Sequence, residues 1–156
     1  MCNLYSITTN QAAIAGLFRR MNRYVGNLPP MPGVFPDYNA PIARNRPADA
    51  GGITRELALA RWGLPSPPQF LSKSGRDPGV TNVRNVGSPH WRRWLGQAHR
   101  CVVPFTSFSE PAPKAGGGSE PVWFALADER PLAVFAGIWV PAWNSLRKVK
   151  EGPVTA

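Results

Sequence analysis

The sequence is poor in cysteine, histidine and acidic residues. Two cysteines and two histidines among 156 residues are too few for a disulfide framework, and they lack the close-spaced pairs of a zinc site. No apolar run approaches the roughly 18 residues that a membrane-spanning helix needs. The first residues also lack the basic and then apolar regions of a secretory signal. We therefore expect a cytoplasmic protein with no metal, no other cofactor and no membrane contact.

Positive charge is what the sequence has in excess. Lys and Arg number 18 against 9 Asp and Glu, so the formal net charge is +9. Such a surplus in a small chain favours a polyanionic partner such as nucleic acid, with binding that weakens as salt rises. The alternative is a cationic surface that serves only solubility. Exposed members of the six tryptophans would suit stacking on unpaired bases, while most are expected in the core.

Hydrophobic periodicity predicts mostly short strands with few helices. Residues 2–7 alternate as a strand, and residues 10–23 form an amphipathic helix that begins near Asn10. Further strands are predicted over 38–43, 53–63, 101–104, 122–127 and 132–140, the last two paired as a hairpin, with a short helix over 88–98 and a surface loop over 65–79. We expect a single α+β domain over residues 1–156, with a mainly antiparallel, barrel-like β core and a few flanking helices.

Cys2 is the residue best suited to chemistry. Met1 is expected to be removed because the next side chain is small, which would leave a free α-amine beside the thiol. The amine titrates near pKa ~7.7–8.0 and the thiol near ~8.5, so both supply some nucleophile at neutral pH. An aminothiol of this kind captures an aldehyde as a Schiff base and then closes a thiazolidine. On position alone, the alternative is a chance residue at a frayed terminus.

Six short segments, in order from the start of the chain to residue 110, resemble motifs of the SRAP family (SOS response-associated peptidase). They are 1–6 (MCNLYS, like MCGRY or MCGRF), 38–41 (YNAP, like the YN-x-AP region), 61–65 (RWGLP, like RWGLIP), 82–85 (NVRN, like NARAE), 100–104 (RCVVP, like RCLVP) and 108–110 (FSE, like FYE). The segment 137–139 (GIW) also resembles the family's AGLW strand. The resemblance therefore covers nearly the whole chain.

This resemblance implies a role in the DNA-damage response, in which an N-terminal thiol crosslinks to an abasic site in single-stranded DNA. Cys2 would be the nucleophile, and Asn82 would orient the terminal amine or the opened sugar. Glu110 would transfer protons during imine formation and ring closure. The plain alternative for Glu110 is a surface carboxylate that precedes a proline.

Three further residues acquire DNA-binding roles from the resemblance. Arg84 would bind a phosphate that flanks the lesion, as a bidentate donor. Trp62 and Pro41 would form apolar walls where the DNA bends away. From the residues alone, a solvated Arg84 and a Trp62 in the core are equally open interpretations.

The chain also departs from the family pattern. Asn3 and Leu4 replace Gly-Arg, which removes one expected phosphate contact, and Ser109 and Pro111 replace Tyr and Trp. The family continues into a segment with a His-x-x-x-Met-Pro signature, and we expect this chain, which ends at Ala156, to lack it. Two other functions stay open: a noncovalent single-stranded DNA-binding module, and a thiol peptidase with an N-terminal nucleophile. In either case we expect a monomer.

Overall fold

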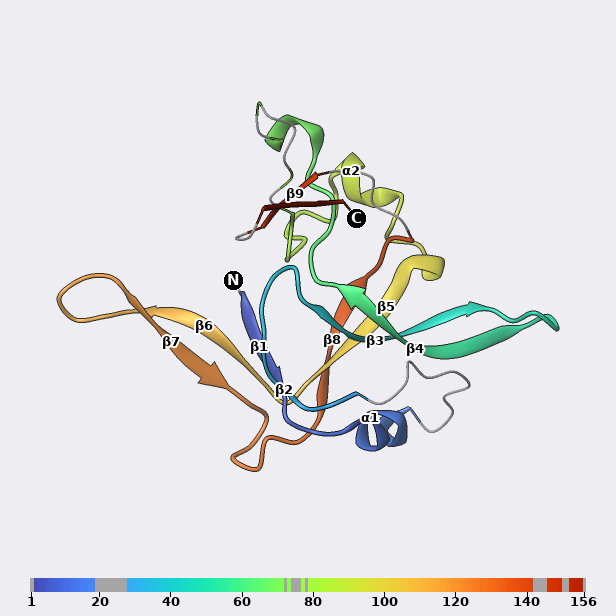
Figure 1. Ribbon diagram of the computed structural model, residues 1–156, viewed down its shortest axis with the longest axis horizontal. Coiled ribbons are helices and arrows are strands. Elements are labelled where there is room, and N and C mark those ends of the chain that lie inside the picture. Colours follow the sequence, from blue (N-terminus) through green and yellow to red (C-terminus); the bar gives the residue numbers. More distant parts are fainter. Residues whose placement is uncertain are drawn as a thin grey trace.

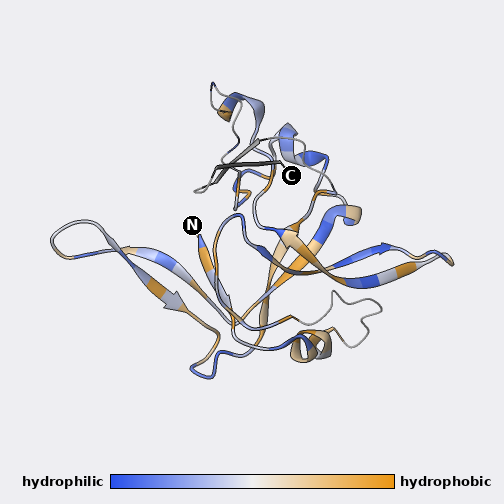
Figure 2. Ribbon diagram, viewed as in Figure 1, coloured by the Kyte–Doolittle hydropathy of each residue, from blue (hydrophilic) through white to orange (hydrophobic). Residues whose placement is uncertain are grey.

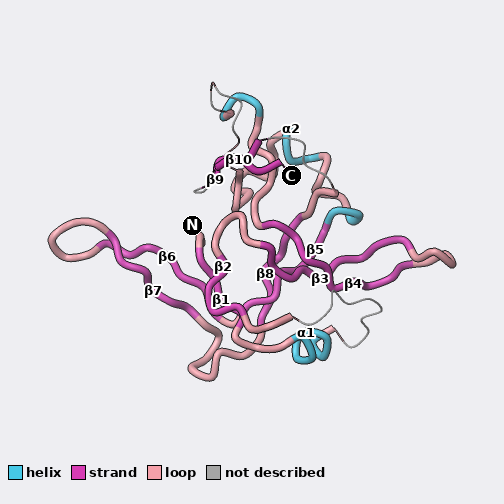
Figure 3. Tube along the Cα trace, in the orientation of Figure 1, coloured by secondary structure: helices cyan, strands magenta, loops and turns pink. Residues whose placement is uncertain are grey.

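The computed structural model describes residues 2–18, 28–71, 73, 77, 79–141, 146–149 and 152–155. Its elements are short and mostly strands (Figures 1 and 3). They are β1 (Leu4–Ile7), α1 (Gln11–Leu17), β2 (Met31–Val34), β3 (Asn39–Pro47), β4 (Ile53–Arg61), α2 (Pro89–Arg92), β5 (Arg100–Phe105), β6 (Ser107–Pro113), β7 (Ser119–Phe124), β8 (Ala133–Ile138), β9 (Leu146–Val149) and β10 (Gly152–Thr155), with 3-10 turns at Pro68–Phe70 and Gln97–His99.

The strands form two four-stranded sheets and one separate hairpin. One sheet has the order β2-β1-β6-β7 and the other β4-β3-β5-β8, while β9 pairs with β10. Every pairing between these strands is antiparallel. The α+β class with a mainly antiparallel sheet is therefore confirmed. Within the described part of the chain both sheets are open, so the expected barrel-like closure is not confirmed.

The two sheets are joined at a buried corner, where β5 passes directly into β6 through Thr106. The Thr106 amide and hydroxyl both donate to the Ser6 carbonyl, at 2.8 and 3.1 Å. The Thr8 amide in turn donates to the Thr106 hydroxyl at 3.1 Å. A single side chain thus satisfies backbone groups that the bend would otherwise leave without partners. The corner also fixes the start of the chain against β6.

An aromatic core lies next to this corner and between the sheets. Tyr5 packs edge-on against both Trp62 and Phe135, with ring centroids 5.0 and 6.1 Å apart. Phe105 stacks on Phe135 at 3.9 Å. Burial of apolar surface favours folding, and Figure 2 shows the apolar segments of β1, β5 and β8 near the centre of the molecule. The first strand is therefore anchored in the core although it opens the chain.

The helix predicted over 10–23 begins where expected. The Asn10 side chain accepts a hydrogen bond from the Ala13 amide at 3.0 Å, which caps α1, and Ile14 is buried. The predicted end of this helix lies outside the described residues. The helix predicted over 88–98 is shorter than expected: α2 covers one turn, and a 3-10 turn precedes β5. The strands predicted over 2–7, 38–43, 53–63 and 101–104 are confirmed as β1, β3, β4 and β5.

The predicted hairpin between residues 122–127 and 132–140 is wrong. Both segments are strands, but β7 pairs with β6 and β8 pairs with β5, in different sheets. The turn that closes the β6–β7 hairpin is the glycine run 116–118, whose residues all have positive φ. Packing explains why β8 pairs with β5, because Phe135 of β8 stacks on Phe105 of β5. Neighbouring strands in the sequence are therefore distributed between the two sheets.

Candidate active site at the start of the first strand

Cys2 is half-buried and packs against the core cluster that contains Tyr5. Its thiol donates to the Leu4 carbonyl at 3.3 Å. Burial raises the pKa of this thiol, and the negative charge of Glu110 raises it further. Burial also raises the pKa of Tyr5, with a smaller contribution from Cys2. The sulfur therefore lies within electrostatic range of one carboxylate and one phenol.

The loop that carries Asn82 lies against the backbone of Cys2. The Asn82 amide donates to the Cys2 carbonyl at 3.2 Å and to the Thr81 hydroxyl at 3.1 Å. Thr81 then donates to the Asn3 side-chain oxygen at 3.3 Å. The bonds to Cys2 and to Asn3 connect residues that are about eighty positions apart in the sequence. The Asn82 side chain therefore contacts the backbone of Cys2, while its expected role in orienting the terminal amine or the opened sugar stays a prediction.

Asp77 anchors the same loop from inside. It is 1% exposed, and its carboxylate accepts the amides of Ser66, at 3.1 and 3.3 Å to its two oxygens, and of Gly79 at 2.7 Å. Leu64 and Val80 add an antiparallel bridge beside it. Sequence reasoning missed Asp77, although an aspartate two residues before a glycine is typical of a tight turn. The loop that was expected at the surface is therefore attached to the interior at this point.

Trp62 contacts both the core and the loop. Its indole packs on Tyr5 and donates to the Thr81 carbonyl at 3.4 Å. The side chain is partly exposed, so one part remains accessible to a ligand. The core interpretation of Trp62 is thus supported by its packing on Tyr5, while its contact with DNA stays a prediction.

Glu110 lies in β6, one residue beyond the Ser109 that pairs with Leu4. It is partly buried, and its cross-strand partner in β7 is Val122. The structure thus brings Cys2, Asn82 and Glu110 together from three distant segments: Asn82 through a hydrogen bond, and Glu110 through its charge. A thiol, an amide and a carboxylate near one another are groups that could serve in the capture of an electrophile that needs proton transfer.

The residues expected to contact DNA differ in their exposure. Arg84 is exposed, two residues beyond Asn82, where it can reach a ligand at the loop. Pro41 is fully buried in β3, which corrects its expected place in an apolar wall, because a side chain without exposed surface cannot touch DNA. Proline is tolerated in this strand because β5 pairs with β3 only at Ala43 and Arg44.

Among the described residues, no group of three or more His, Cys, Asp or Glu side chains could hold a metal ion. In the same part of the chain, no helix is long and apolar enough to cross a membrane. Both histidines contact backbone carbonyls: His90 lies 3.0 Å from that of Pro65, and His99 lies 3.1 Å from that of Trp139.

The family model described as SOS response associated peptidase (SRAP) matches residues 1–154. The chain belongs to the SRAP family. No curated protein matches this SRAP chain. A crystal structure of a protein from Bordetella bronchiseptica shares its fold, with a TM-score of 0.62 and 22% sequence identity over 89% of this chain. The SRAP chain spans 64% of the length of that protein. Family membership associates the chain with the DNA-damage response.

Proposed function

We propose that this SRAP protein binds single-stranded DNA and traps abasic sites covalently through Cys2. The observation that carries the proposal is the hydrogen bond of 3.2 Å from the Asn82 amide to the Cys2 carbonyl. It fixes the backbone of the residue whose amine and thiol would react. The DNA-damage association of the family supplies the substrate class: the ring-opened deoxyribose of an abasic site is an aldehyde.

The reaction balances with one molecule of water lost. After Met1 is removed, the α-amine of Cys2 adds to the aldehyde carbon, and loss of the aldehyde oxygen as water gives a Schiff base. The Cys2 sulfur then adds to the imine carbon, and the nitrogen receives a proton. The product holds a new C–N and a new C–S bond in a thiazolidine ring, with no oxidant or reductant consumed. Removal of the residue ahead of Cys2 is also the step that fits a peptidase in the family name.

Glu110 is the proton-transfer group in this proposal. The pKa of the Cys2 thiol is raised by burial and by Glu110, so the thiol is mainly protonated at neutral pH. A carboxylate in range of the sulfur can accept that proton as the sulfur attacks, and can return a proton where water leaves. Asn82, which carries no charge, orients the nucleophile without competing for the proton.

Positive charge supports DNA as the partner. The formal net charge is +9, and Arg84 is exposed two residues beyond Asn82. A guanidinium at this place can bind a phosphate next to the lesion. The exposed part of Trp62 provides an apolar surface beside the same loop. Each phosphate contact should contribute to a salt-dependent affinity.

The test is a crosslinking reaction between the purified full chain and single-stranded DNA with one abasic site, resolved on a denaturing gel. We expect a shifted band that forms without borohydride and that Cys2→Ala abolishes. Asn82→Ala and Glu110→Gln should each slow its formation by about tenfold to a hundredfold. Cys101→Ala is the matched control and should leave the band unchanged. An equal band with Cys2→Ala would refute the covalent mechanism.

Asn3 and Leu4, which stand in place of the Gly-Arg of the family motif, favour one alternative, a noncovalent single-stranded DNA-binding module. That function predicts salt-sensitive binding that is unchanged by Cys2→Ala and indifferent to the lesion. Measuring binding to intact and abasic strands in the same experiment separates the two functions. A twofold or smaller difference between the strands, with no denaturation-resistant band, would select the noncovalent module.

A further inference from the structure

The turn between β2 and β3 places two exposed aromatic rings side by side. Phe35 and Tyr38 are 45% and 50% exposed, and their ring centroids lie 5.6 Å apart with 61° between the ring planes. Among the aromatic contacts of the described residues, theirs is the pair in which both rings are exposed. Two rings in contact at the surface form an apolar patch that is open to a ligand.

The backbone of the turn holds this aromatic pair in place. The Tyr38 amide donates to the Phe35 carbonyl at 3.0 Å, and the two residues between them are Pro36 and Asp37, the latter with φ of 73°. Proline at the second position and a positive φ at the third are typical of a type II turn. A positive φ is uncommon for aspartate, and the Asp37 amide is held by a hydrogen bond of 2.9 Å to the Trp62 carbonyl. Rings that are ordered in advance lose little conformational entropy when they bind.

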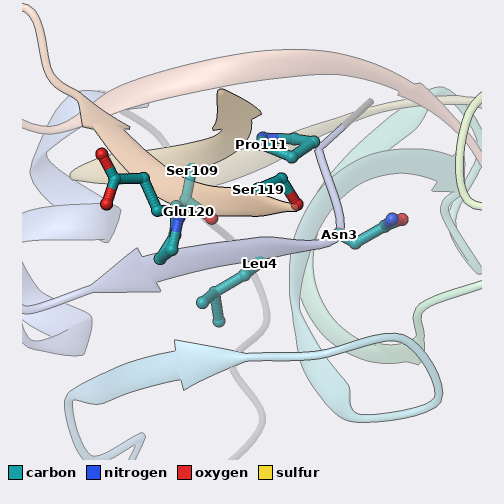
Figure 4. A pocket seen from close by; sticks show the side chains of 7 residues that line it. Asn3, Leu4, Ser109, Pro111, Ser119 and Glu120 are labelled. Carbon is teal, nitrogen blue, oxygen red and sulfur yellow. The ribbon is translucent and has the colours of Figure 1, made fainter. Parts of the chain in front are cut away.

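On one side the aromatic pair adjoins the strand that carries Cys2. A Cβ atom on Gly33 would lie 3.3 Å from the Phe35 ring and 3.6 Å from the Leu4 side chain, so both side chains lie next to the same glycine. The Leu4 carbonyl accepts the Cys2 thiol at 3.3 Å. Figure 4 shows that the Leu4 side chain extends from β1 in a different direction from that of Asn3. Leu4 therefore connects the aromatic pair to the candidate nucleophile.

On its other side the aromatic pair is attached to the loop of the candidate site. The Tyr38 carbonyl accepts the Trp62 amide at 2.9 Å. The Trp62 indole donates to the Thr81 carbonyl at 3.4 Å, and the next residue, Asn82, donates to the Cys2 carbonyl at 3.2 Å. The turn is thus fixed relative to Cys2 by contacts with β1 and with this loop.

Ring faces and charge indicate which ligand suits the pair. Every base has a flat π face, so exposed aromatic side chains bind unpaired bases by stacking, whatever their sequence. The acidic residue of the turn, Asp37, forms an ion pair with Arg61 at 3.4 Å, which offsets its negative charge toward DNA. Leu4 stands where the family motif has arginine. At this place the chain therefore offers apolar surface instead of a phosphate contact.

We propose that Phe35 and Tyr38 stack on an unpaired base that flanks the abasic residue, without preference among the bases. This inference rests on the proposed function, because it takes single-stranded DNA as the ligand. Affinity that an arginine at position 4 would supply through a phosphate comes here from stacking. Since stacking releases no counterions, this part of the affinity does not weaken as salt rises.

The test uses DNA that cannot react. Oligonucleotides carry one tetrahydrofuran residue, a stable abasic analogue without an aldehyde, and binding to the full chain is followed by fluorescence anisotropy at several salt concentrations. Tyr38→Leu keeps the apolar bulk but loses the aromatic face, so affinity should fall about fivefold to tenfold. The slope of log affinity against log salt should stay the same. Unchanged affinity, or a changed slope, would overturn the inference.

Two further variants assign the loss to stacking at this turn. Tyr38→Phe keeps the ring and should bind as the unaltered chain does; a loss as large as that of Tyr38→Leu would assign the effect to the hydroxyl and refute stacking. Trp123→Leu removes an aromatic ring of similar exposure, 42%, from β7 at the other edge of the sheet. It should leave binding unchanged, and an equal loss there would also contradict the assignment.

A second tetrahydrofuran residue identifies the stacked base. Replacing each nucleotide that flanks the first one in turn should weaken binding at one position about as much as Tyr38→Leu does. The replacement and Tyr38→Leu together should cost no more than either alone, because both remove the same contact. Additive losses at every position would overturn the inference.

Two parallel measurements separate this inference from the proposed function. If natural abasic strands give no covalent band while Tyr38→Leu still weakens binding, the proposed function fails and the stacking assignment stands. A covalent band together with unchanged affinity in Tyr38→Leu gives the reverse. Size-exclusion chromatography tests the other occupant, a second copy of this chain: an oligomer that Tyr38→Leu dissociates without any effect on DNA binding would refute the inference.

Discussion

Cys2 and Cys101 place the same thiol in two different surroundings, one at the open start of a sheet and one inside the other sheet. Burial raises the pKa of both, to about 11 for Cys101. Cys101 is buried in β5, and its sulfur lies against Gly137 so closely that an added Cβ there would be 2.9 Å away. Cys2 is half-buried, with Asn82 on its carbonyl and the charge of Glu110 nearby.

This difference shows that a raised pKa does not by itself distinguish a structural cysteine from a candidate nucleophile. Cys101 fills space as a small apolar side chain in a buried cluster with Ile42 and Ala58. Cys2 is only half-buried, and in the proposed function Asn82 orients it and Glu110 receives its proton. The difference between Cys2 and Cys101 depends on solvent access to the sulfur and on the polar groups beside it. Each of these two factors can be tested separately.

The largest expected effect is in thiol alkylation of the native protein. Iodoacetamide should modify Cys2 about a hundredfold faster than Cys101, because Cys101 is exposed only when the structure opens. Peptide mass mapping over a time course measures both rates in one sample. In denaturant, which serves as the control, the two rates should converge. Similar rates in the native protein would contradict the contrast.

Next in size is the effect of adding one methyl group beside Cys101. Gly137→Ala should destabilise the protein by about 2 kcal/mol in urea unfolding, because the new Cβ overlaps the sulfur. Cys101→Ala in the same chain should restore most of the loss. Gly16→Ala, in a helix with nothing within 4 Å, is the control and should not destabilise. If the double variant is no more stable than Gly137→Ala alone, the crowding is not at the sulfur.

A smaller effect is expected at the buried carboxylate that anchors the Asn82 loop. Asp77→Asn keeps one acceptor oxygen but weakens the bonds to Ser66 and Gly79, at a cost of about 1 kcal/mol. The rate of abasic-site crosslinking should fall several-fold in Asp77→Asn. The double variant Asp77→Asn/Asn82→Ala should crosslink no more slowly than Asn82→Ala alone. Asp49→Asn, at an exposed turn, is the matched control. Additive losses in the double variant would show that Asp77 acts independently of Asn82.

The smallest effect concerns the charge beside Cys2. A nearby negative charge disfavours the thiolate, so Glu110→Gln should lower the pKa of Cys2 while burial remains the main cause of its elevation. The midpoint of the pH dependence of Cys2 alkylation should move to lower pH. Glu129→Gln, at an exposed turn, should leave it in place. A midpoint that moves to higher pH would reverse the sign of the interaction.

The sequence predicts most strands but not all of their partners. Alternation locates β1, β3, β4 and β5, and the cap at Asn10 locates the start of α1. Pairing depends on contacts between distant residues. The predicted strands 122–127 and 132–140 are separated by a short connection that suits a hairpin. The Phe105–Phe135 stack indicates why β8 joins the other sheet instead.

The candidate site is predicted in part. Cys2, Asn82 and Glu110 are identified by motif resemblance, and the structure brings them together. The supporting contacts of Asp77 and Thr81 are not visible in the sequence, because each depends on how the loop folds back. Pro41 lies in a recognisable motif, but its burial is set by the packing of β3 and could not be read from the motif.

The pairing of Leu4 with Ser109 has a consequence for how the protein is made. On a ribosome that adds about 5–20 residues per second, roughly 5–20 seconds pass between synthesis of these two partners. During that interval the first strand lacks its β6 neighbour, and the corner at Thr106 does not yet exist. The order of synthesis therefore leaves the start of the chain accessible before folding covers it, which gives time for the removal of Met1 that the proposed function requires.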